Sequence, residues 1–288
     1  MNTQGEDFTA VAARIRMNMP SLTGTEAKVA RTLTNYEALQ KGTPIREVAE
    51  EAGVSEALVV KVSKKLGFDG FKEIKAALIG YRSGSSADLY DEISSDDDLD
   101  TVASKVFRTS IQALEETRAI LDIEGIERTA KVLARAEKVD IYGVGGSAQI
   151  ARDIAHKFLR IGRRIAVFDD PHMMNMSASV LDAADAVIAV SHSGNSEAVL
   201  AAAELARNNA ATVIALSNYA RSPLADIADI TLASTALGGP LLGENAAARI
   251  AQLNIFDVVF VEVARLDGKL AELRLALTSK AVTNKRRS

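Results

Sequence analysis

Cysteine is absent from this sequence of 288 residues, and so is any long apolar stretch. Without cysteine the fold can contain neither disulfide bonds nor thiolate metal sites, which fits a reducing compartment. The N-terminus has no basic flank followed by an apolar core, and no run reaches the roughly 18 apolar residues of a membrane-spanning helix. We therefore expect a cytoplasmic protein with no membrane partner, no bound metal and no cofactor.

The composition is that of ordinary globular proteins, with 48% hydrophobic and 25% charged residues. The length corresponds to about two domains of roughly 150 residues each. The net charge of −4 is spread unevenly. Residues 83–100 contain seven acidic and no basic residues, whereas residues 276–288 contain four basic and no acidic ones.

The acidic segment 83–100 begins with Ser-Gly-Ser-Ser and lacks hydrophobic periodicity, which is typical of an interdomain linker. We therefore predict a first domain at 1–82, a linker at 83–100, a second domain at 101–275 and a basic tail at 276–288. Ser94 or Ser95, each followed by acidic residues, is the expected N-cap of the helix that opens the second domain.

The first domain contains signals for three short helices, at 25–39, 44–52 and 55–67. The expected start and stop signals are the capping box Thr23-Gly-Thr-Glu26, Thr43 ahead of Pro44, Gly53, and Ser55. A short turn with a glycine between the second and third helices is the geometry of a helix-turn-helix. The positions at which these two helices must face each other are all small or apolar: Val48, Ala49, Ala52, Val54, Val59 and Val62. A purely structural helical hairpin remains the alternative.

The third helix has the features of a helix that enters a DNA major groove. Lys61, Lys64 and Lys65 share one face away from the valines, and we expect them to contact phosphates. The first residues of the helix would approach base edges: Ser55, Glu56 and Ala57. An ordinary solvated lysine face is the alternative.

The run VSEALVVKVSKKLGFDGFKEIK at 54–75 resembles the helix-turn-helix of the RpiR-type transcription regulators, over about residues 20–80. In that family the recognition helix typically ends in a Lys/Arg-Leu-Gly-Phe-x-Gly-Phe/Tyr segment. The sequence departs from the family at Leu58, where a small polar residue is more usual, and at Lys61, where arginine is commoner. The resemblance implies a DNA operator as partner but does not give its sequence, because lysine and arginine differ in guanine recognition.

The second domain alternates helical segments with short apolar runs that are typical of buried strands. The runs lie at 139–142, 164–168, 186–190, 212–216 and 230–232, after helices expected at 101–121 and 124–136. This alternation predicts an α/β domain with a parallel five-stranded sheet flanked by helices, joined to the all-α first domain. A later apolar helix with Ile255, Phe256, Val258, Val259 and Phe260 is expected to be buried all round, in the core by default or at a subunit interface.

Ligands of such sheets bind beyond the carboxyl ends of the strands, which directs attention to two loops. The loop after the first strand is Gly143-Val-Gly-Gly-Ser147, and the loop after the third is Ser191-His-Ser-Gly-Asn-Ser196. Hydroxyls and free backbone N–H groups at a helix N-terminus suit a phosphate. Simple capping by Ser193 or Ser196 is the alternative. A nicotinamide cofactor is disfavoured because position 148 is alanine and Asp169 is poorly placed for a ribose.

Together, the two loops resemble those of the phosphosugar-binding SIS domain, named for sugar isomerases, over about residues 101–270. The resemblance implies that a phosphate is held by four serines, Ser147, Ser191, Ser193 and Ser196, with Gly146 and Asn195 as backbone donors. It also implies that Glu244 lies near the sugar end and that His172 contacts the sugar. One departure is Ala247, where these regulators often carry serine.

The two resemblances together imply a transcription regulator whose second domain senses a phosphorylated sugar and alters operator affinity. A phosphosugar isomerase or lyase, with Glu197 or Glu244 as base, is the alternative. We favour the regulator because an isomerase gains nothing from a DNA-reading module, so no catalytic residue is expected. Paired half-sites about 34–36 Å apart need two recognition helices, so a homodimer or homotetramer is expected.

Overall fold

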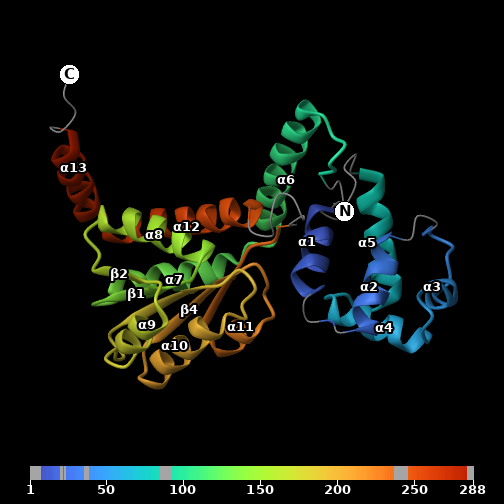
Figure 1. Cartoon of the computed structure of the whole chain (residues 1–288), viewed down its shortest axis with the longest axis horizontal. Helices are drawn as coiled ribbons and strands as arrows, with labels where there is room; N and C mark the ends of the chain where they lie inside the picture. The colour runs from blue at the N-terminus through green and yellow to red at the C-terminus, as the bar shows by residue number, and fades with distance from the viewer. Residues whose placement is uncertain are drawn as a thin grey trace, which may run out of the picture. The chain divides into compact units, whose positions relative to one another are not determined.

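The structure is a computed structural model that describes residues 8–19, 22, 24–35, 39–84, 93–236 and 246–283 (Figure 1). Packing divides the chain into two compact units, 1–120 with 235–247 and 121–234 with 248–288. The first helix expected in the second domain, near 101–121, therefore groups with the first unit. Within the described ranges, no helix combines the length and the apolar character needed to cross a membrane.

The first unit is helical throughout its regular structure. Its helices are α1 (Phe8–Asn18), α2 (Thr25–Asn35), α3 (Ile45–Ala52), α4 (Glu56–Lys65), α5 (Phe71–Gly84) and α6 (Leu99–Ala119). Helices α2, α3 and α4 pack on one another pairwise, as a helix-turn-helix requires. The residues predicted to face each other across the turn are buried in one hydrophobic core, namely Val48, Ala49, Ala52, Val59 and Val62, with Val54 partly buried beside them.

The boundaries of the helix-turn-helix follow two of the three expected signals. Ser55 caps α4, since its hydroxyl accepts a hydrogen bond from Leu58 N at 3.3 Å, and Gly53 ends α3 in the left-handed conformation at φ 66°. Thr43 does not cap α3. Its hydroxyl instead accepts a hydrogen bond from Gln40 N at 2.9 Å, and Pro44 occupies the N-cap position. The threonine closes the preceding turn, and the helix starts without a side-chain cap.

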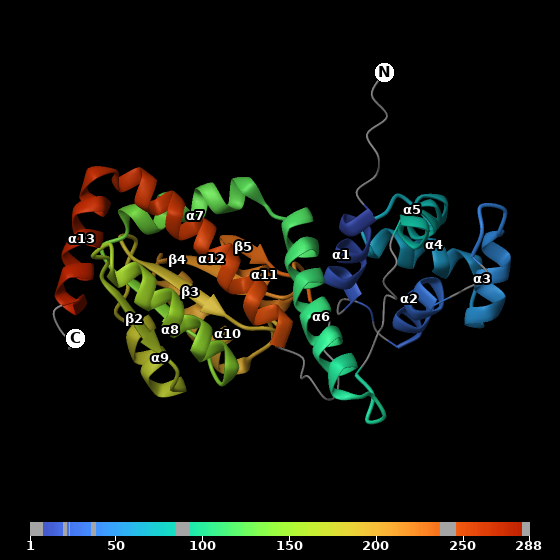
Figure 2. The ribbon, with the colours of Figure 1, turned by 90° about the horizontal axis from the view of Figure 1, so that it is seen from above.

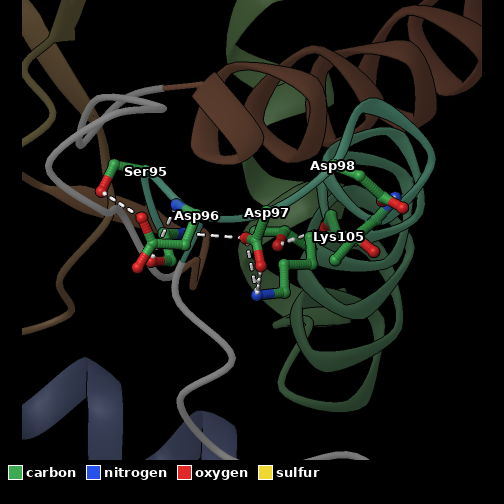
Figure 3. A network of polar contacts seen from close by, with 8 residues as sticks. Ser95, Asp96, Asp97, Asp98 and Lys105 are labelled. Carbon is green, nitrogen blue, oxygen red and sulfur yellow. Dashed lines mark hydrogen bonds and ion pairs between the residues drawn. The ribbon is translucent and has the colours of Figure 1, made fainter.

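The N-cap of helix α6 lies later than expected, at an aspartate (Figure 3). The N-cap is Asp98, whose carboxylate accepts a hydrogen bond from Thr101 N at 2.8 Å, so the prediction of a cap at Ser94 or Ser95 was wrong. Asp97 pairs with Lys105, the seventh residue of the helix, at 2.8 Å. The hydrogen bonds from Thr101 hold the pKa of Asp98 below its usual value of 3.8. A carboxylate outcompetes the serine hydroxyls here because its charge also interacts favourably with the helix dipole.

The second unit contains a parallel five-stranded sheet of order β2-β1-β3-β4-β5. Its strands are β1 (Val139–Tyr142), β2 (Ile165–Phe168), β3 (Ala186–Val190), β4 (Thr212–Ser217) and β5 (Ile230–Ala233), within one residue of the predicted runs. Its helices are α7 (Ile123–Arg135), α8 (Gly146–Leu159), α9 (Pro171–Ala178), α10 (Glu197–Asn208), α11 (Pro223–Ile227), α12 (Ala246–Asp267, except its first two residues) and α13 (Lys269–Thr283).

Helices cover both faces of the sheet, as predicted for a doubly covered parallel sheet (Figure 1). One core joins the sheet to α7, α8 and α12, and a separate core joins it to α9, α10 and α11. The side chains of β1 and β3 are buried on both faces, which explains why these strands are continuous apolar runs.

Two C-terminal helices expose apolar side chains. The expected burial of α12 in the core applies to one side of the helix: Ile255, Phe256 and Val259 lie in the core, whereas Val258 is 44% exposed in this chain, where burial at a subunit interface stays a prediction. Helix α13 lies at the end of the unit where the strands begin, joined to the α8–β2 turn by a hydrogen bond from Arg274 Nη1 to the Ile161 carbonyl (Figure 2). Most of α13 is therefore open to solvent within this chain.

Candidate functional site

The first candidate site is the exposed side of α4. The N-cap Ser55 and the first-turn residues Glu56 and Ala57 are exposed, as is Lys64, the residue before the last of the helix. The Ser55 hydroxyl is already engaged as the helix cap, which leaves Glu56 and Ala57 as the side chains of this turn without a capping role. This arrangement fits a helix whose N-terminal end approaches base edges.

The other two predicted phosphate contacts, Lys61 and Lys65, are held by an acidic residue of α2. Glu26 Oε1 lies 3.2 Å from Lys61 Nζ, and Glu26 Oε2 lies 2.7 Å from Lys65 Nζ. The hydrogen bonds from Lys65 and then Lys61 lower the pKa of Glu26. Both carboxylate oxygens of Glu26 thus pair with lysines across the contact between α2 and α4. The other residue of the predicted capping box, Thr23, lies outside the described residues.

The second candidate site lies at the carboxyl edge of the sheet, where the strand order reverses. Strand β1 lies between β2 and β3, so the chain turns one way after β1 and the other way from β3 onward. Tyr142 at the end of β1 pairs with Ala189 in β3. The loops that follow these two strands therefore emerge side by side at the switch point of the sheet, as the sequence predicted.

The loop after β1 brings backbone donors to this edge. Gly145 has φ 57° and ψ −125°, a conformation that glycine adopts readily and other residues avoid. Ser147 N donates to the Val144 carbonyl at 3.1 Å, whereas within the described part of the chain the N–H groups of Gly145 and Gly146 have no acceptor. A Cβ at Gly143 would lie 3.1 Å from the Ser147 carbonyl oxygen, so the start of α8 packs directly on the backbone of this loop.

The serine loop after β3 leads into the N-terminus of α10. Ser191 is buried, and its N–H donates to the Leu216 carbonyl in β4 at 3.0 Å. Ser196 occupies the N-cap position, but its hydroxyl forms no capping bond. Ser193 Oγ accepts a hydrogen bond from Asn195 N at 3.2 Å, so this N–H is free for a ligand only if that bond breaks. The simple-capping alternative therefore does not describe Ser196.

A third loop, after β4, supports the serine loop and was missed by the sequence analysis. Asn218 N donates to the His192 carbonyl at 3.0 Å, and Leu224 N donates to the Gly194 carbonyl at 2.9 Å. A Cβ at Gly194 would lie only 2.2 Å from Ser222 Oγ. The sequence contained a signal for this loop, namely the polar residues that follow the buried strand β4. Because β4 lies beside β3 and runs parallel to it, both strands end at the same edge of the sheet.

The predicted sugar-end residues are less well defined. His172 is exposed in the first turn of α9, and Glu244 lies outside the described residues. Asp169, weighed above as a ribose partner, forms an ion pair with Arg152 of α8. Helix α9 is fixed to the sheet by Ser177, which hydrogen-bonds the buried Asp140 of β1. His172 thus stands on a helix that is anchored at its other end.

The arrangement at the sheet edge is suited to an anion. Neither the loop 143–147 nor the loop 191–196 contains lysine or arginine, so the donors are hydroxyls and backbone N–H groups. The first intrahelical bond of α10 runs from Leu200 N to the Ser196 carbonyl, so the three preceding N–H groups point out of the helix end. Free N–H groups and the positive end of the helix dipole both favour negative charge at this position.

Comparisons with known proteins match both units. The "Helix-turn-helix domain, rpiR family" profile matches residues 9–85, and the SIS domain profile matches residues 132–261. The HTH-type transcriptional regulator RpiR of Escherichia coli (strain K12) is 40% identical over 272 residues, which cover 94% of this chain and 92% of that protein.

Solved structures with the same fold include a full-length match and a single-domain match. The Vibrio vulnificus NanR protein complexed with ManNAc-6P has a TM-score of 0.62 at 25% identity and covers 96% of this chain and 100% of its own. The sugar isomerase domain of an RpiR transcription factor from Sphaerobacter thermophilus has a TM-score of 0.58 at 23% identity and covers 62% of this chain and 98% of its own. With 40% identity over nearly its whole length, the chain belongs to the RpiR family of helix-turn-helix transcriptional regulators with a SIS domain.

Proposed function

We propose that this regulator senses a phosphorylated sugar at the carboxyl edge of the sheet and changes its operator affinity when the sugar binds. The phosphate would be held by Ser147, Ser191, Ser193 and Ser196, with the Gly146 N–H as a further donor. The observation that carries the proposal is Ser196, which sits at the N-cap of α10 without capping it. Its hydroxyl and the open N–H groups of the first turn are available to an anion.

A relative supports the class of ligand. The Vibrio vulnificus NanR protein, 25% identical, has a solved structure in complex with ManNAc-6P, a sugar phosphate. A ligand changes DNA affinity only if it binds more tightly to one arrangement of the DNA-binding helices than to another. The sugar releases the protein from DNA if it favours the arrangement with low operator affinity, and it strengthens DNA binding if it favours the other.

On the DNA side, α4 would place Glu56 and Ala57 near base edges, with Ser55 at the helix cap and Lys64 on the phosphates. A single helix-turn-helix reads one half-site, so the regulator would act as a homodimer or homotetramer on paired half-sites. A protein with this target works in the compartment that holds the operator, in agreement with the cytoplasmic expectation.

The SIS domain would act as a sensor and not as an enzyme. The identity to a transcriptional regulator extends over both units, including the helix-turn-helix. We therefore expect the purified protein to bind its sugar phosphate without converting it, which product analysis after prolonged incubation at stoichiometric protein concentration would test. Conversion of the bound sugar would favour the isomerase alternative.

The decisive experiment is thermal unfolding of the full-length protein against a panel of sugar phosphates. A ligand that binds only the folded state at 100 times its Kd adds about 2.7 kcal/mol to stability, so one compound should raise the melting temperature. Ser191→Ala and Ser193→Ala should abolish that rise.

Ser179→Ala is the matched control, because Ser179 is an exposed serine of the same unit outside both loops. It should respond to the sugar phosphate like the wild type. A panel without any shift, or a shift that survives in both loop variants, would contradict the proposed site.

A further inference from the structure

The pairing of Glu26 with the lysines of α4 is built into the packing of the helix-turn-helix. Glu26 stands on the same stripe of α2 as Val29, Ala30 and Leu33, which are fully buried. Its side chain is 11% exposed, against 62% for Lys61 and 35% for Lys65. The carboxylate is thus nearly enclosed, while the two ammonium groups reach toward it from the solvent side.

This geometry puts Glu26 in competition with DNA for the same two cations. A phosphate that takes one lysine away from Glu26 leaves one oxygen of the nearly enclosed carboxylate without its ion-pair partner beside the polyanion, and loss of both lysines leaves the whole carboxylate unpaired. Burying an unpaired charge is costly, and the like charge of the DNA raises that cost. As long as the pairs persist, the three lysines of α4 present less positive charge to the DNA backbone than their number suggests.

The consequence is clearest for binding that depends on phosphates alone. Non-specific DNA affinity comes almost entirely from cations that neutralise phosphates, whereas operator affinity also includes base contacts. An internal anion that occupies two cations therefore removes a large share of the free energy of non-specific binding, whereas operator binding loses the same amount and keeps its base contacts.

We propose that Glu26 limits the affinity of α4 for DNA, because it competes with DNA phosphates for Lys61 and Lys65 and thereby lowers non-specific binding. The inference rests on the proposed use of α4 as the DNA-contacting helix. It adds to that proposal a residue of α2 that touches no base.

The test compares the full-length wild type with Glu26→Gln on two duplexes of about 30 base pairs. One has random sequence, and the other is selected by the wild type from a randomised pool. For Glu26→Gln we expect roughly 3- to 10-fold tighter binding to random DNA near 0.1 M salt. The slope of log K against log salt should steepen by about 0.9 for each additional phosphate engaged, to a maximum of about 1.8. The selected duplex should gain affinity by a similar factor, because its phosphates meet the same lysines.

Two further variants assign the effect to the lysines. In a Lys61→Gln, Lys65→Gln background, Glu26→Gln should give no gain, because the competing cations are gone. Glu127→Gln is the charge-matched control, since Glu127 pairs with Lys131 in the other unit and its loss changes the net charge equally. A gain of the same size in Glu127→Gln would attribute the effect to net charge and overturn the proposal.

Glu26→Asp keeps the experiment decisive if Glu26→Gln does not fold. The shorter side chain retains the charge but cannot span both ammonium groups, so an intermediate gain is expected. Unchanged or weaker binding of random DNA by a folded Glu26 variant would overturn the inference alone. Failure of the wild type to bind any duplex, even at low salt, would overturn the DNA-binding role of α4 as well.

Discussion

At Gly194 the lack of a side chain is a structural requirement. The residue has φ 64°, and a Cβ would lie 2.2 Å from Ser222 Oγ and 2.4 Å from Ser222 Cβ. The clash involves a Cβ atom, which follows the backbone and cannot rotate away. The serine loop and the loop after β4 can therefore pack closely only when position 194 is glycine.

Gly194→Ala should destabilise the second unit by about 2–4 kcal/mol, because left-handed strain adds to overpacking. Urea unfolding followed by circular dichroism measures this loss. The control is Gly268→Ala at φ 54°, where the nearest atom to a new Cβ is 4.0 Å away. Strain alone should cost about 1–2 kcal/mol there. Equal losses in both variants would mean that the contact with Ser222 is not restrictive.

Residue roles could be predicted from the sequence where the partner is close along the chain. Ser55 caps the helix that begins one residue later, and the motif alone identified it. Glu26 was assigned to a capping box for the same reason, but its partners are 35 and 39 residues away across a helix contact. No periodicity within one helix contains that information, so the competition for the lysines became visible only in three dimensions.

At the scale of elements, the acidic turn before α6 makes the start of that helix dependent on pH. The pKa of Asp98 is lowered by the hydrogen bonds from Thr101. A carboxyl group with a lowered pKa in the folded state stabilises that state fully above its unfolded pKa, near 3.8. The contribution is lost as the pH falls through the still lower folded pKa.

Asp98→Asn should therefore have the same melting temperature as the wild type near pH 7, because asparagine also caps helices. Below about pH 4 the variant should melt at a higher temperature than the wild type, because only the wild type loses its ionised cap. Asp98→Ala removes the cap at every pH and should lower the melting temperature by about 2–4 °C near neutrality. Thermal unfolding between pH 7 and pH 3 gives both comparisons. A constant difference between wild type and Asp98→Asn over this range would contradict the assigned cap.

Helix α13 carries an apolar stripe that its own chain leaves uncovered. Leu270, Leu273 and Leu277 lie on one side of the helix and are each about half exposed, whereas Ala271 and Arg274 face the unit. An isolated helix of 15 residues is marginal in water. A second copy that packs on this stripe would stabilise the helix and supply the second recognition helix of the proposed homodimer.

Replacing Leu273 and Leu277 by lysine should shift the protein from dimer to monomer in light scattering after gel filtration. Ala276→Lys with Ser279→Lys adds the same charge on another exposed side of α13 and should leave the dimer intact. A dimer that survives the leucine changes would place the subunit interface elsewhere.

Elements were predictable where burial dictates the pattern. The central strands β1, β3 and β4 agree with the sequence because parallel strands covered on both faces must be continuous apolar runs. For helix α12 the sequence left the core and a subunit interface open, because its apolar residues surround the whole helix and composition alone does not distinguish a core contact from an uncovered face. Val258 and Val261 both belong to the exposed side.

For the whole molecule, the two resemblances gave the domain content but not the packing of α6. The helix follows the acidic segment and was assigned to the second domain, yet it packs against α1. Thr117 near its end donates to the Thr235 carbonyl at 3.2 Å. The segment after β5 thus returns to the first unit, a long-range contact that no local motif encodes.

The fit between Gly194 and Ser222 also has a consequence for protein engineering. Transplanting the six-residue serine loop onto another parallel sheet would transfer the hydroxyl groups without the surface that shapes them. The backbone of residues 217–224 supplies the hydrogen bonds to the His192 and Gly194 carbonyls, so the smallest portable module comprises both loops. A designer would have to transfer the ends of β3 and β4 together with both loops.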